Sequence, residues 1–502
     1  MKDNRIIKTI QETALHQGDT LCFDDLNKSM SYLELENKSN ALAQYLEENF
    51  PNKQPIIVYG GQEAFMLVAF LACTKSGHAY VPIDDHTPKE RVSMIYSEAD
   101  STCVLALSDW PLAHGVVHNR SEILLKSESG KQPSFKHCVS GDDIYYIIFT
   151  SGTTGKPKGV QITYNNLISF IDWMLLDFGL KPKQRFLCQA PFSFDLSVMD
   201  VYPALLLQGT LVSMPKQMTE NFPLLFQSIP NMLLNVWVST PSLVEMCLLS
   251  PDFNEEVLPD LKTFLFCGEE LPKKVAEKLV ERFSKATIFN TYGPTETTVA
   301  ITEVKLTSEI LANYDRVPLG KVKSDTNIFI LDDSNNILNH GEIGEIIIAG
   351  PSVSPGYFEN PEKTEEAFFM FNNQPAYRTG DSGLLEDGYL FYKGRMDFQI
   401  KLNGFRMELG DIDNHLTELP GVRLACTVPK MNKLGKVNQL VAYIVLEEKV
   451  LDAVGKTKEL KADLKELVMD YMIPQRFVYV EELPLTPNGK VDRKFLINEV
   501  NG

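Results

Sequence analysis

A glycine- and hydroxyl-rich loop holds the densest group of chemically capable residues. Residues 147–159 read IIFTSGTTGKPKG, and the apolar run that enters the loop predicts a buried strand. Glycines let backbone N–H groups converge, while hydroxyls and ammonium groups add donors. The loop therefore predicts a polyphosphate grip, with an ordinary surface turn as the alternative. Its candidate ligands are Thr150, Ser151, Gly152, Thr153, Thr154, Gly155 and Lys156.

Two common phosphate loops do not fit this segment. A Walker A loop requires G-x-x-x-x-G-K-[ST], but Gly152 lies only three residues before Gly155, and Pro157 follows the lysine. The G-x-G-x-x-G spacing of dinucleotide-binding turns is also missing from the loop. The loop is of another type, and its chemical partners must lie further along the chain.

A carboxylate in an apolar setting is the second candidate. Asp195 stands between Phe194 and Leu196 in the segment QAPFSFDLSVMD. A carboxylate in such company is costly unless it is paired. It is either a cap of the following helix or an anion that receives a cationic ligand group.

Two expected strand ends carry further candidates, because ligands bind at the carboxyl ends of strands in open α/β sheets. Cys267 follows the strand Thr263–Phe266, although a lone cysteine is usually a small buried hydrophobe. The strand 287–290 ends in NTYGPTE, where Tyr292 could stack on a base. Glu296 could hold Mg²⁺ beside phosphates. An ordinary turn with a helix cap is the alternative.

Three candidates lie in the last third of the chain. Asp381, in YRTGD, has the chemistry to hold a ribose diol, or it is a turn carboxylate. Arg395 lies in the segment GRMD. Lys490 sits on a tight Asn-Gly turn, where a lysine is normally a solvated charge.

The elements that must position these residues follow two patterns. Over residues 1–140, helical and strand patterns alternate, as in the expected helix 31–50, strand 55–59 and helix 63–75. This alternation predicts a parallel sheet with helices on its faces. From about Asn327, short alternating runs between turns predict a small antiparallel β-unit. A compact unit of about a hundred residues follows it.

Bulk properties exclude several classes of function. The chain has 502 residues and a formal net charge of −18, which argues against nucleic acid or an anionic membrane as its main partner, because both favour basic surfaces. The N-terminus has no signal-peptide pattern, and the longest strongly apolar run, 64–73, is too short for a membrane span. Eight scattered cysteines predict reduced thiols and a cytoplasmic protein, with neither a zinc site nor a disulfide framework.

Taken together, the motifs resemble those of the adenylate-forming superfamily, which includes acyl-CoA synthetases, luciferases and peptide-synthetase adenylation domains. The matching segments, in order, are TSGTTGKPKG, FDLSVMD, NTYGPTE, YRTGD, GRMDFQIKLNGFRMEL and NGKVDRK. They cover the chain from about residue 20 to the end. GHAYVPID, QAPFSFDLSVMDVYP, TFLFCGEELP and FQIKLNGFRMELGDI resemble the branch that activates D-alanine for teichoic acid D-alanylation.

The resemblance implies a two-step ligase reaction with ATP and Mg²⁺. D-alanine and ATP give D-alanyl-AMP and pyrophosphate, and the phosphopantetheine thiol of a D-alanyl carrier protein then takes the alanyl group. Glu296 would hold Mg²⁺, and Lys490 would bridge the carboxylate and the α-phosphate. Tyr292 would stack on adenine, and Asp381 would bind the ribose with Arg395. The further nucleotide-binding residues implied are Asn290, Thr291, Gly293, Pro294, Thr295, Tyr392, Lys393 and Gly394.

The resemblance also implies a substrate pocket. Asp195 matches the residue that pairs with the α-ammonium group of an amino acid, and Cys267 would favour the D enantiomer. Bulky neighbours would leave space for a methyl side chain. The other pocket positions are Leu196, Met199, Leu265, Thr291, Val299 and Ala300.

The implied fold class is α/β, with a large N-terminal domain of α/β sheets, a small β-subdomain and a small mobile α+β C-terminal domain. The expected boundaries are 1–395 for the core with its β-subdomain at about 327–395, 396–398 for the hinge, and 399–502 for the mobile domain. Asp397 would be the hinge, and the turn at Gly404 would replace Lys490 at the site between the half-reactions. A monomer is expected.

Two rival functions stay open on the residues alone. One is another stand-alone amino acid-adenylating or acyl-CoA-type ligase, and Asp195 argues against an acyl-CoA substrate. The other is a catalytically inactive nucleotide-binding or scaffold protein of the same fold, which the full set of motif residues disfavours.

Overall fold

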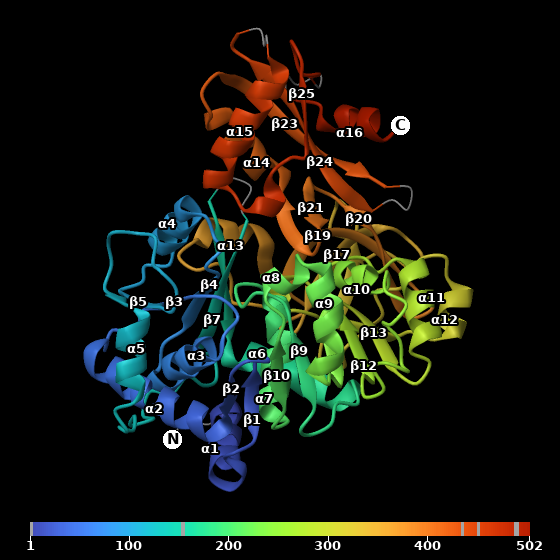
Figure 1. Ribbon diagram of the computed structural model, residues 1–502. Coiled ribbons are helices and arrows are strands. Elements are labelled where there is room, and N and C mark those ends of the chain that lie inside the picture. The colour runs from blue at the N-terminus through green and yellow to red at the C-terminus, as the bar shows by residue number, and fades with distance from the viewer. Residues whose placement is uncertain (1–3, 152–155, 433–435, 449–451, 486–490) are drawn as a thin grey trace.

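The computed structural model describes residues 4–151, 156–432, 436–448, 452–485 and 491–502. Its N-terminal part contains two large sheets, and a third sheet follows them (Figure 1). The remaining strands form a hairpin and a three-stranded sheet, which lie at the top of the view in orange and red. These C-terminal elements stand over one end of the larger sheets.

The first large sheet contains six strands, of which the first five in spatial order run parallel. Alternation of strands with helices such as α3 (Ala64–Ser76) therefore gives the parallel sheet that the sequence predicts. The final pair, β7 and β8, is antiparallel, so the glycine-rich loop connects the two strands of a hairpin. In spatial order the strands are β6 (Val117–His118), β5 (Cys103–Ala106), β3 (Ile56–Tyr59), β4 (Tyr80–Ile83), β7 (Ile144–Thr150) and β8 (Lys158–Thr163).

The second large sheet contains nine strands with a parallel centre and antiparallel edges. Residue Phe266 of β12 pairs with Asn290 of β13, so the carboxyl ends of these strands lie side by side. Tyr292 is the last residue of β13, because it still pairs with Thr302; the sequence places it after that strand. In spatial order the strands are β15 (Lys321–Val322), β14 (Thr302–Lys305), β13 (Thr287–Tyr292), β12 (Thr263–Phe266), β11 (Val236–Ser239), β9 (Arg185–Cys188), β10 (Thr210–Ser213), β1 (Leu21–Asp24) and β2 (Ser29–Ser31).

The helices of the N-terminal part cover both large sheets. One large core cluster joins α2, α3, α6 and α7 with strands of both sheets, so these helices pack between them. Helix α2 begins with a capping box of Ser31 and Glu34, and α3 ends at Gly77 in the left-handed conformation. The helices are α1 (Arg5–Gln17), α2 (Tyr32–Asn49), α3 (Ala64–Ser76), α4 (Lys89–Glu98), α5 (Arg120–Ser127), α6 (Tyr164–Asp177), α7 (Val198–Leu206), α8 (Lys216–Thr219), α9 (Phe222–Ser228), α10 (Pro241–Cys247), α11 (Lys273–Arg282), α12 (Ser308–Asn313) and α13 (Pro361–Ala367).

The third sheet is fully antiparallel, as the short alternating runs of the sequence predict. It brings Asp381 of β19 opposite Arg395 of β20. Its strands are β16 (Asn327–Leu331), β17 (Gly344–Ala349), β18 (Phe368–Phe371), β19 (Gln374–Glu386) and β20 (Tyr389–Arg395).

The C-terminal elements have a core of their own. Helices α14 and α15 pack with the hairpin and the three-stranded sheet around buried residues such as Leu416, Ile444 and Leu460. The elements are β21 (Gln399–Leu402), β22 (Phe405–Glu408), α14 (Leu409–Glu418), β23 (Val422–Met431), β24 (Val437–Leu446), α15 (Ala453–Leu467), β25 (Arg476–Tyr479) and α16 (Arg493–Asn501). Within the described ranges, no helix is both long enough and apolar enough to cross a membrane.

Candidate functional site

A cavity of about 500 Å³ lies where the carboxyl ends of the sheet strands meet the C-terminal elements. Its wall combines Asp195, Cys267 and Tyr292 of the N-terminal part with Gly404 and Lys436 from the far end of the chain. The volume lies within the range of small-ligand pockets. Segments that are more than two hundred residues apart in sequence therefore build one site.

Asp195 lies on the cavity wall, in the short 3₁₀ turn Asp195–Ser197 that precedes α7. It does not cap α7, because that helix has Ser197 at its N-cap and no side-chain cap bond. Burial raises the pKa of Asp195, while a hydrogen bond from Thr295 and the charge of Lys401 oppose the rise. A carboxylate in this position gains most from a cationic ligand group.

Cys267 faces the same cavity from the end of β12. It is buried, and its Sγ lies 3.6 Å from the Val299 carbonyl oxygen. Leu196, Thr291 and Val299 also line the cavity. The described lining does not include the expected pocket residues Met199, Leu265 and Ala300, which are buried in the core.

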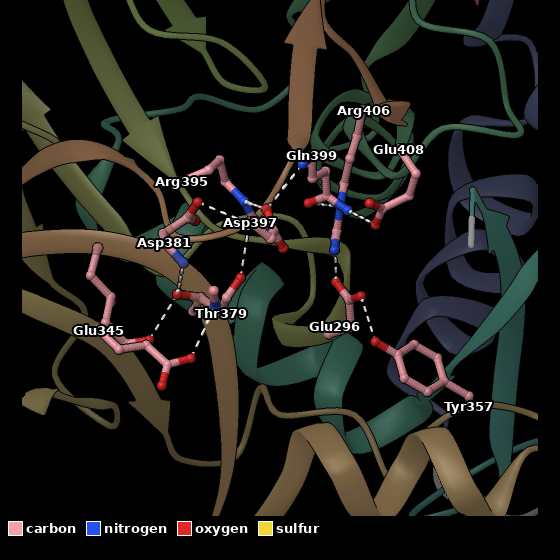
Figure 2. Close-up of polar contacts among 12 residues, drawn as sticks. Glu296, Glu345, Tyr357, Thr379, Asp381, Arg395, Asp397, Gln399, Arg406 and Glu408 are labelled. Atoms are coloured by element: carbon pink, nitrogen blue, oxygen red, sulfur yellow. Dashed lines mark hydrogen bonds and ion pairs between the residues drawn. The ribbon is translucent and has the colours of Figure 1, made fainter. Parts of the chain in front are cut away.

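Tyr292, Asp381 and Arg395 form a connected group at another part of the wall. The Tyr292 hydroxyl donates to Asp381 Oδ2 at 2.5 Å, and Arg395 Nη1 donates to Asp381 Oδ1 at 2.9 Å. Arg395 Nη1 also donates to the Thr379 carbonyl, as Figure 2 shows. These bonds fix the Asp381 carboxylate beside an aromatic ring, an arrangement suited to a nucleoside.

Most of the remaining nucleotide-site candidates lie near this group. The cavity wall includes Thr291, Gly293, Pro294, Thr295, Tyr392, Lys393 and Gly394. Asn290 is placed differently: it is buried and its side-chain amide donates to the Pro318 carbonyl at 2.8 Å. It is not part of the described lining.

The start of the glycine-rich loop reaches the cavity. Thr150 and Ser151 are in its wall, and within the described residues the buried Thr150 Oγ1 has no hydrogen-bond partner. Lys156 is exposed and forms an ion pair with Glu98 at 3.3 Å. The candidates Gly152, Thr153, Thr154 and Gly155 lie outside the described residues.

Glu296 is fully buried and both of its carboxylate oxygens have partners. Tyr357 donates to Oε1 at 2.9 Å, and Arg406 Nη1 donates to Oε2 at 2.7 Å (Figure 2). Burial would raise its pKa, but the charges of Arg406 and Lys158 hold the pKa at about 2. The carboxylate is thus ionised and already neutralised, so it does not fit a metal ion in this arrangement. The described residues bring Asp84, Asp85 and His86 close enough for metal binding, but exposed acidic groups of this kind are common without a metal.

The β21–β22 hairpin carries Arg406 into the site. Asn403 and Gly404 form its two-residue loop, with φ values of 52° and 86°, as an Asn-Gly hairpin turn requires. Gly404 lies so close to Thr240 that an added Cβ would overlap the threonine Cγ2. Phe405, next in the chain, stacks on Tyr471 with ring centroids 3.9 Å apart.

Asp397, the hinge candidate, follows β20 and caps the entry to the hairpin. Its Oδ1 accepts from Arg395 Nε at 2.8 Å and from the Gln399 backbone N–H at 3.0 Å. Burial would raise the pKa of Asp397, but the hydrogen bonds and charge of Arg395 hold it below its usual range. Lys490 lies outside the described residues.

Three residues that act on Glu296, two by hydrogen bonds and one through its charge, were not predicted from the sequence. Arg406 and Tyr357 bond to it directly, and Lys158 lies with its Nζ 5.0 Å from the centre of the Tyr357 ring. Burial lowers the pKa of Lys158. One signal could have identified Arg406: it stands two residues after the Gly404 turn, which was expected at the site.

Comparisons with known proteins cover almost the whole chain. The AMP-binding enzyme family model matches residues 10–358, and the model of the AMP-binding enzyme C-terminal domain matches residues 411–490. A D-alanine–D-alanyl carrier protein ligase of Lacticaseibacillus paracasei is 49% identical, covering 100% of both chains. The Lactiplantibacillus plantarum ligase of the same name is 49% identical over 99% of each.

A solved structure agrees in fold. The Vibrio cholerae adenylation domain AlmE, in complex with glycyl-adenosine-5'-phosphate, superposes with a TM-score of 0.82 at 22% identity. The match covers 99% of this chain and 97% of that one. It supports the adenylate-forming fold, with a large N-terminal and a small C-terminal domain.

Proposed function

Since the chain belongs to the AMP-binding enzyme family, we propose that it is a ligase that activates D-alanine and loads it onto a D-alanyl carrier protein. Adenylate-forming enzymes use ATP. The D-alanine carboxylate attacks the α-phosphorus, which forms D-alanyl-AMP and releases pyrophosphate. The carrier's phosphopantetheine thiol then attacks the alanyl carbonyl, a thioester forms, and AMP leaves. The product would serve D-alanylation of (lipo)teichoic acid.

The observation that carries the proposal is the placement of Asp195 and the Tyr292–Asp381 pair in one cavity. The first offers an anion for an α-ammonium group. The second offers an aromatic ring and a carboxylate for a nucleoside. A cavity that receives both groups brings an amino acid to an adenosine phosphate, which is the arrangement that the first step needs.

The nucleotide would lie with its base against Tyr292 and its ribose hydroxyls at Asp381. Thr150 and Ser151 would meet the β- and γ-phosphates, because they line the cavity and Thr150 has a hydroxyl without a described partner. Attack of one anion on another requires charge neutralisation. We assign that task to Lys490, whose ammonium group would bridge the carboxylate and the α-phosphate.

Substrate size and handedness would be set by the wall around Cys267. Leu196 and Val299 share that wall and restrict the space beside Asp195. A single steric contact of this kind discriminates by about 1–3 kcal/mol, so selectivity for D- over L-alanine should be modest.

Mg²⁺ belongs to the proposal as the companion of ATP, with Glu296 as its carboxylate ligand. Glu296 can take this role only after Arg406 has left it, since the guanidinium occupies one carboxylate oxygen here. In the arrangement described, Arg406 and Lys158 neutralise the buried charge of Glu296.

The second step would use the arrangement described here, in which Gly404 and Lys436 close the cavity. Residues 399–502 would rotate about Asp397, so that Gly404 and Lys436 replace Lys490 at the cavity. We expect Asp397→Pro to impair transfer more than adenylation, because proline fixes φ. Equal losses in the two half-reactions would argue against the rotation.

We place the reaction in the cytoplasm, where ATP is available and where eight buried free thiols stay reduced. We also propose that the protein acts as a monomer, because one chain supplies every described wall of the cavity.

ATP–pyrophosphate exchange tests the substrate assignment. D-alanine should support faster exchange than L-alanine or glycine, and acetate should support almost none. Exchange driven better by acetate would favour an acyl-CoA-type ligase. A thioester assay with the holo-carrier and both alanine enantiomers then tests the second step.

A further inference from the structure

Asp381, the proposed ribose ligand, is presented by an irregularity in the third sheet. Strands β17 and β19 pair residue by residue on either side of it, but within it three residues of β19, 379–381, lie opposite the single residue Ile346 of β17. Such a bulge bends a strand and re-aims a side chain, and bulges are common beside active sites. Its middle residue, Gly380, has a φ of 66°, which glycine adopts without strain. The bulge therefore decides where the Asp381 carboxylate points.

Glu345 binds this bulge from the neighbouring strand β17. Its Oε1 accepts from the Gly380 backbone N–H at 3.2 Å, and its Oε2 accepts from Arg378 Nη1 at 2.8 Å. Figure 2 shows the Glu345 side chain next to Thr379, below Asp381. One carboxylate thus holds both the residue before the bulge and the residue at its centre.

Thr379 connects the same bulge to Asp381. Its Oγ1 donates to the Ile346 carbonyl oxygen at 2.8 Å and accepts from the Asp381 backbone N–H at 2.9 Å. The Thr379 carbonyl oxygen accepts from Arg395 Nη1, which also binds the Asp381 carboxylate. One network therefore sets the backbone position of Asp381 and the direction of its carboxylate, and Glu345 holds that network at Gly380.

Glu345 itself does not face the ligand cavity. The described wall includes Asp381 and Arg395 but does not include Glu345. The Glu345 side chain is mostly buried, and the guanidinium of Arg378 balances its charge. Its effect on a bound nucleotide must therefore pass through the backbone of residues 380 and 381.

The bond from Gly380 to Glu345 is not what holds the sheet together. Strands β17 and β19 remain paired on both sides of the bulge, so loss of one bond at the interruption leaves this ladder in place. What the bond adds is a fixed conformation at the point where Asp381 enters the cavity. A binding group must be held within about 0.5 Å of its working position, and the residues that support it provide that precision.

We propose that Glu345 is a positioning residue for the nucleotide ribose: by holding the Gly380 N–H, it sets the bulge that presents Asp381 to the ribose hydroxyls. This inference rests on the proposed function, in which Asp381 binds the ribose, and it adds the residue that fixes Asp381 in place. The acceptor atom of Glu345 carries the effect, whereas its negative charge serves the ion pair with Arg378.

AMP and its 2′,3′-dideoxy analogue separate this role from general stability, because the analogue has no ribose hydroxyl for Asp381. Calorimetry measures the Kd of each nucleotide for the full-length protein. Glu345→Asp keeps the charge but is one methylene shorter, so it withdraws the acceptor from Gly380. We expect it to weaken AMP binding roughly 5- to 100-fold, as loss of one hydrogen bond does, and to change binding of the analogue less than about twofold. Equal weakening of both nucleotides would overturn the proposal.

Two further variants assign the effect to the acceptor atom. Glu345→Gln loses the charge, but its amide oxygen can still accept from Gly380, so AMP affinity should stay within about threefold of wild type. Glu386→Ala removes an exposed carboxylate from the same strand, β19, and should bind both nucleotides as wild type does. A larger loss of AMP affinity in Glu345→Gln than in Glu345→Asp would overturn the proposal, because charge rather than reach would then matter.

The binding measurement is independent of the amino acid substrate. If D-alanine failed to support pyrophosphate exchange while the loss in Glu345→Asp stayed specific to AMP, the substrate assignment would fall and the role of Glu345 would stand. Normal exchange with D-alanine, together with equal weakening of both nucleotides, would remove only the role of Glu345.

Discussion

Two buried carboxylates near the cavity are each held by two partners. Asp381 is bonded by Tyr292 and Arg395, and Glu296 by Tyr357 and Arg406. Asp195 differs, because burial raises its pKa, and the largest effects that oppose the rise are a hydrogen bond from Thr295 and the charge of Lys401. Of these three carboxylates of the cavity region, the one with the least complete neutralisation is the one that we assign to the substrate.

Replacement of Asp195 by alanine should reduce D-alanine activation about 100-fold or more, because loss of one partner of a buried ion pair costs about 3–5 kcal/mol. The kcat/KM for pyrophosphate exchange with D-alanine measures the loss. Propionate, which lacks the ammonium group, should lose far less.

Glu270→Gln serves as the matched control for the Asp195 variant. Glu270 also lines the cavity, but it is exposed and pairs with Arg316. Similar losses in both variants would show that wall charge in general, rather than an ammonium partner, is responsible.

A histidine outside the site gives a prediction about pH. His78 is buried, its Nε2 lies 2.8 Å from the Phe50 carbonyl oxygen, and burial lowers its pKa to about 4. The unfolded chain protonates near pH 6.5, so stability is complete above that pH and is lost as pH falls toward 4. The slope from this group is about 1.4 kcal/mol per pH unit.

Urea unfolding of wild type and His78→Gln at pH 7 and pH 5 measures this contribution. The wild-type midpoint should fall more between the two pH values than the midpoint of the variant. Equal falls would mean that other groups carry the pH dependence.

At the scale of elements, the β21–β22 hairpin decides how the C-terminal part meets the site. Its Asn403–Gly404 turn allows a tight reversal, and its tip fits beside Thr240 only because Gly404 lacks a Cβ. The turn sequence is thus required twice, for its backbone conformation and for a close approach.

Gly404→Ala should hinder hairpin docking, since the new Cβ would overlap Thr240. We expect thioester transfer to the holo-carrier to fall at least tenfold and to fall more than adenylate formation. Single-turnover measurement of each half-reaction separates the two effects.

The control for this variant is Gly388→Ala. Gly388 also occupies a hairpin turn with positive φ, at 77°, but an added Cβ would have no neighbour within 4 Å. Both variants therefore place an alanine at a similar positive φ, but only Gly404→Ala also creates a steric overlap. An equal loss of transfer in both variants would remove the overlap as the cause.

On the scale of the whole molecule, a strongly acidic chain builds a cavity with a local excess of cationic groups. The lining has the acids Asp195, Glu269, Glu270, Asp381 and Asp397, and its cationic residues outnumber them. These cations are Arg91, Arg316, Lys393, Arg395, Lys401, Arg406 and Lys436. Net charge excludes polyanions as general partners but does not prevent local binding of a nucleotide.

Lys436 links the two parts of the molecule across this cavity. Its Nζ lies 2.9 Å from Glu269 Oε2 and 2.7 Å from Ser242 Oγ. Lys436→Gln should leave the buried Glu269 short of a cation, at a cost of about 1–3 kcal/mol in docking. We expect transfer to fall roughly 5- to 100-fold, as measured with the holo-carrier.

Lys456→Gln is the comparison for this change. Lys456 pairs with Glu459 within α15, so its replacement removes the same charge without breaking a contact between the domains. If both variants lost transfer equally, the Lys436–Glu269 contact would not be what holds the domains together.

Several features follow from sequence patterns because they depend on local physics. The helix expected at 31–50 is α2, and the buried apolar run entering the glycine-rich loop is β7. The alternating runs after Asn327 form the antiparallel sheet. Periodicity and turn residues determine such elements because each buries one face or reverses the chain within a few residues.

The sequence also identified, by ordered motifs, the family and the residues Asp195, Cys267, Tyr292 and Asp381, which the structure brings to one cavity. It could not place Asn290, which bonds to Pro318, nor Lys156, which pairs with Glu98. Side-chain direction at a strand end or in a loop depends on neighbours from distant segments.

The sequence by itself determined the family and many of the helices and strands. It also determined that the glycine-rich loop, where polyphosphate binding is expected, carries hydroxyl and ammonium groups. Only the tertiary structure decided that Ser151 of that loop contacts Arg406 and that Arg406 pairs with Glu296. The reason is physical: a buried carboxylate must be neutralised by whichever cation the fold delivers, and a cation delivered from 110 residues away leaves no pattern in the sequence next to Glu296.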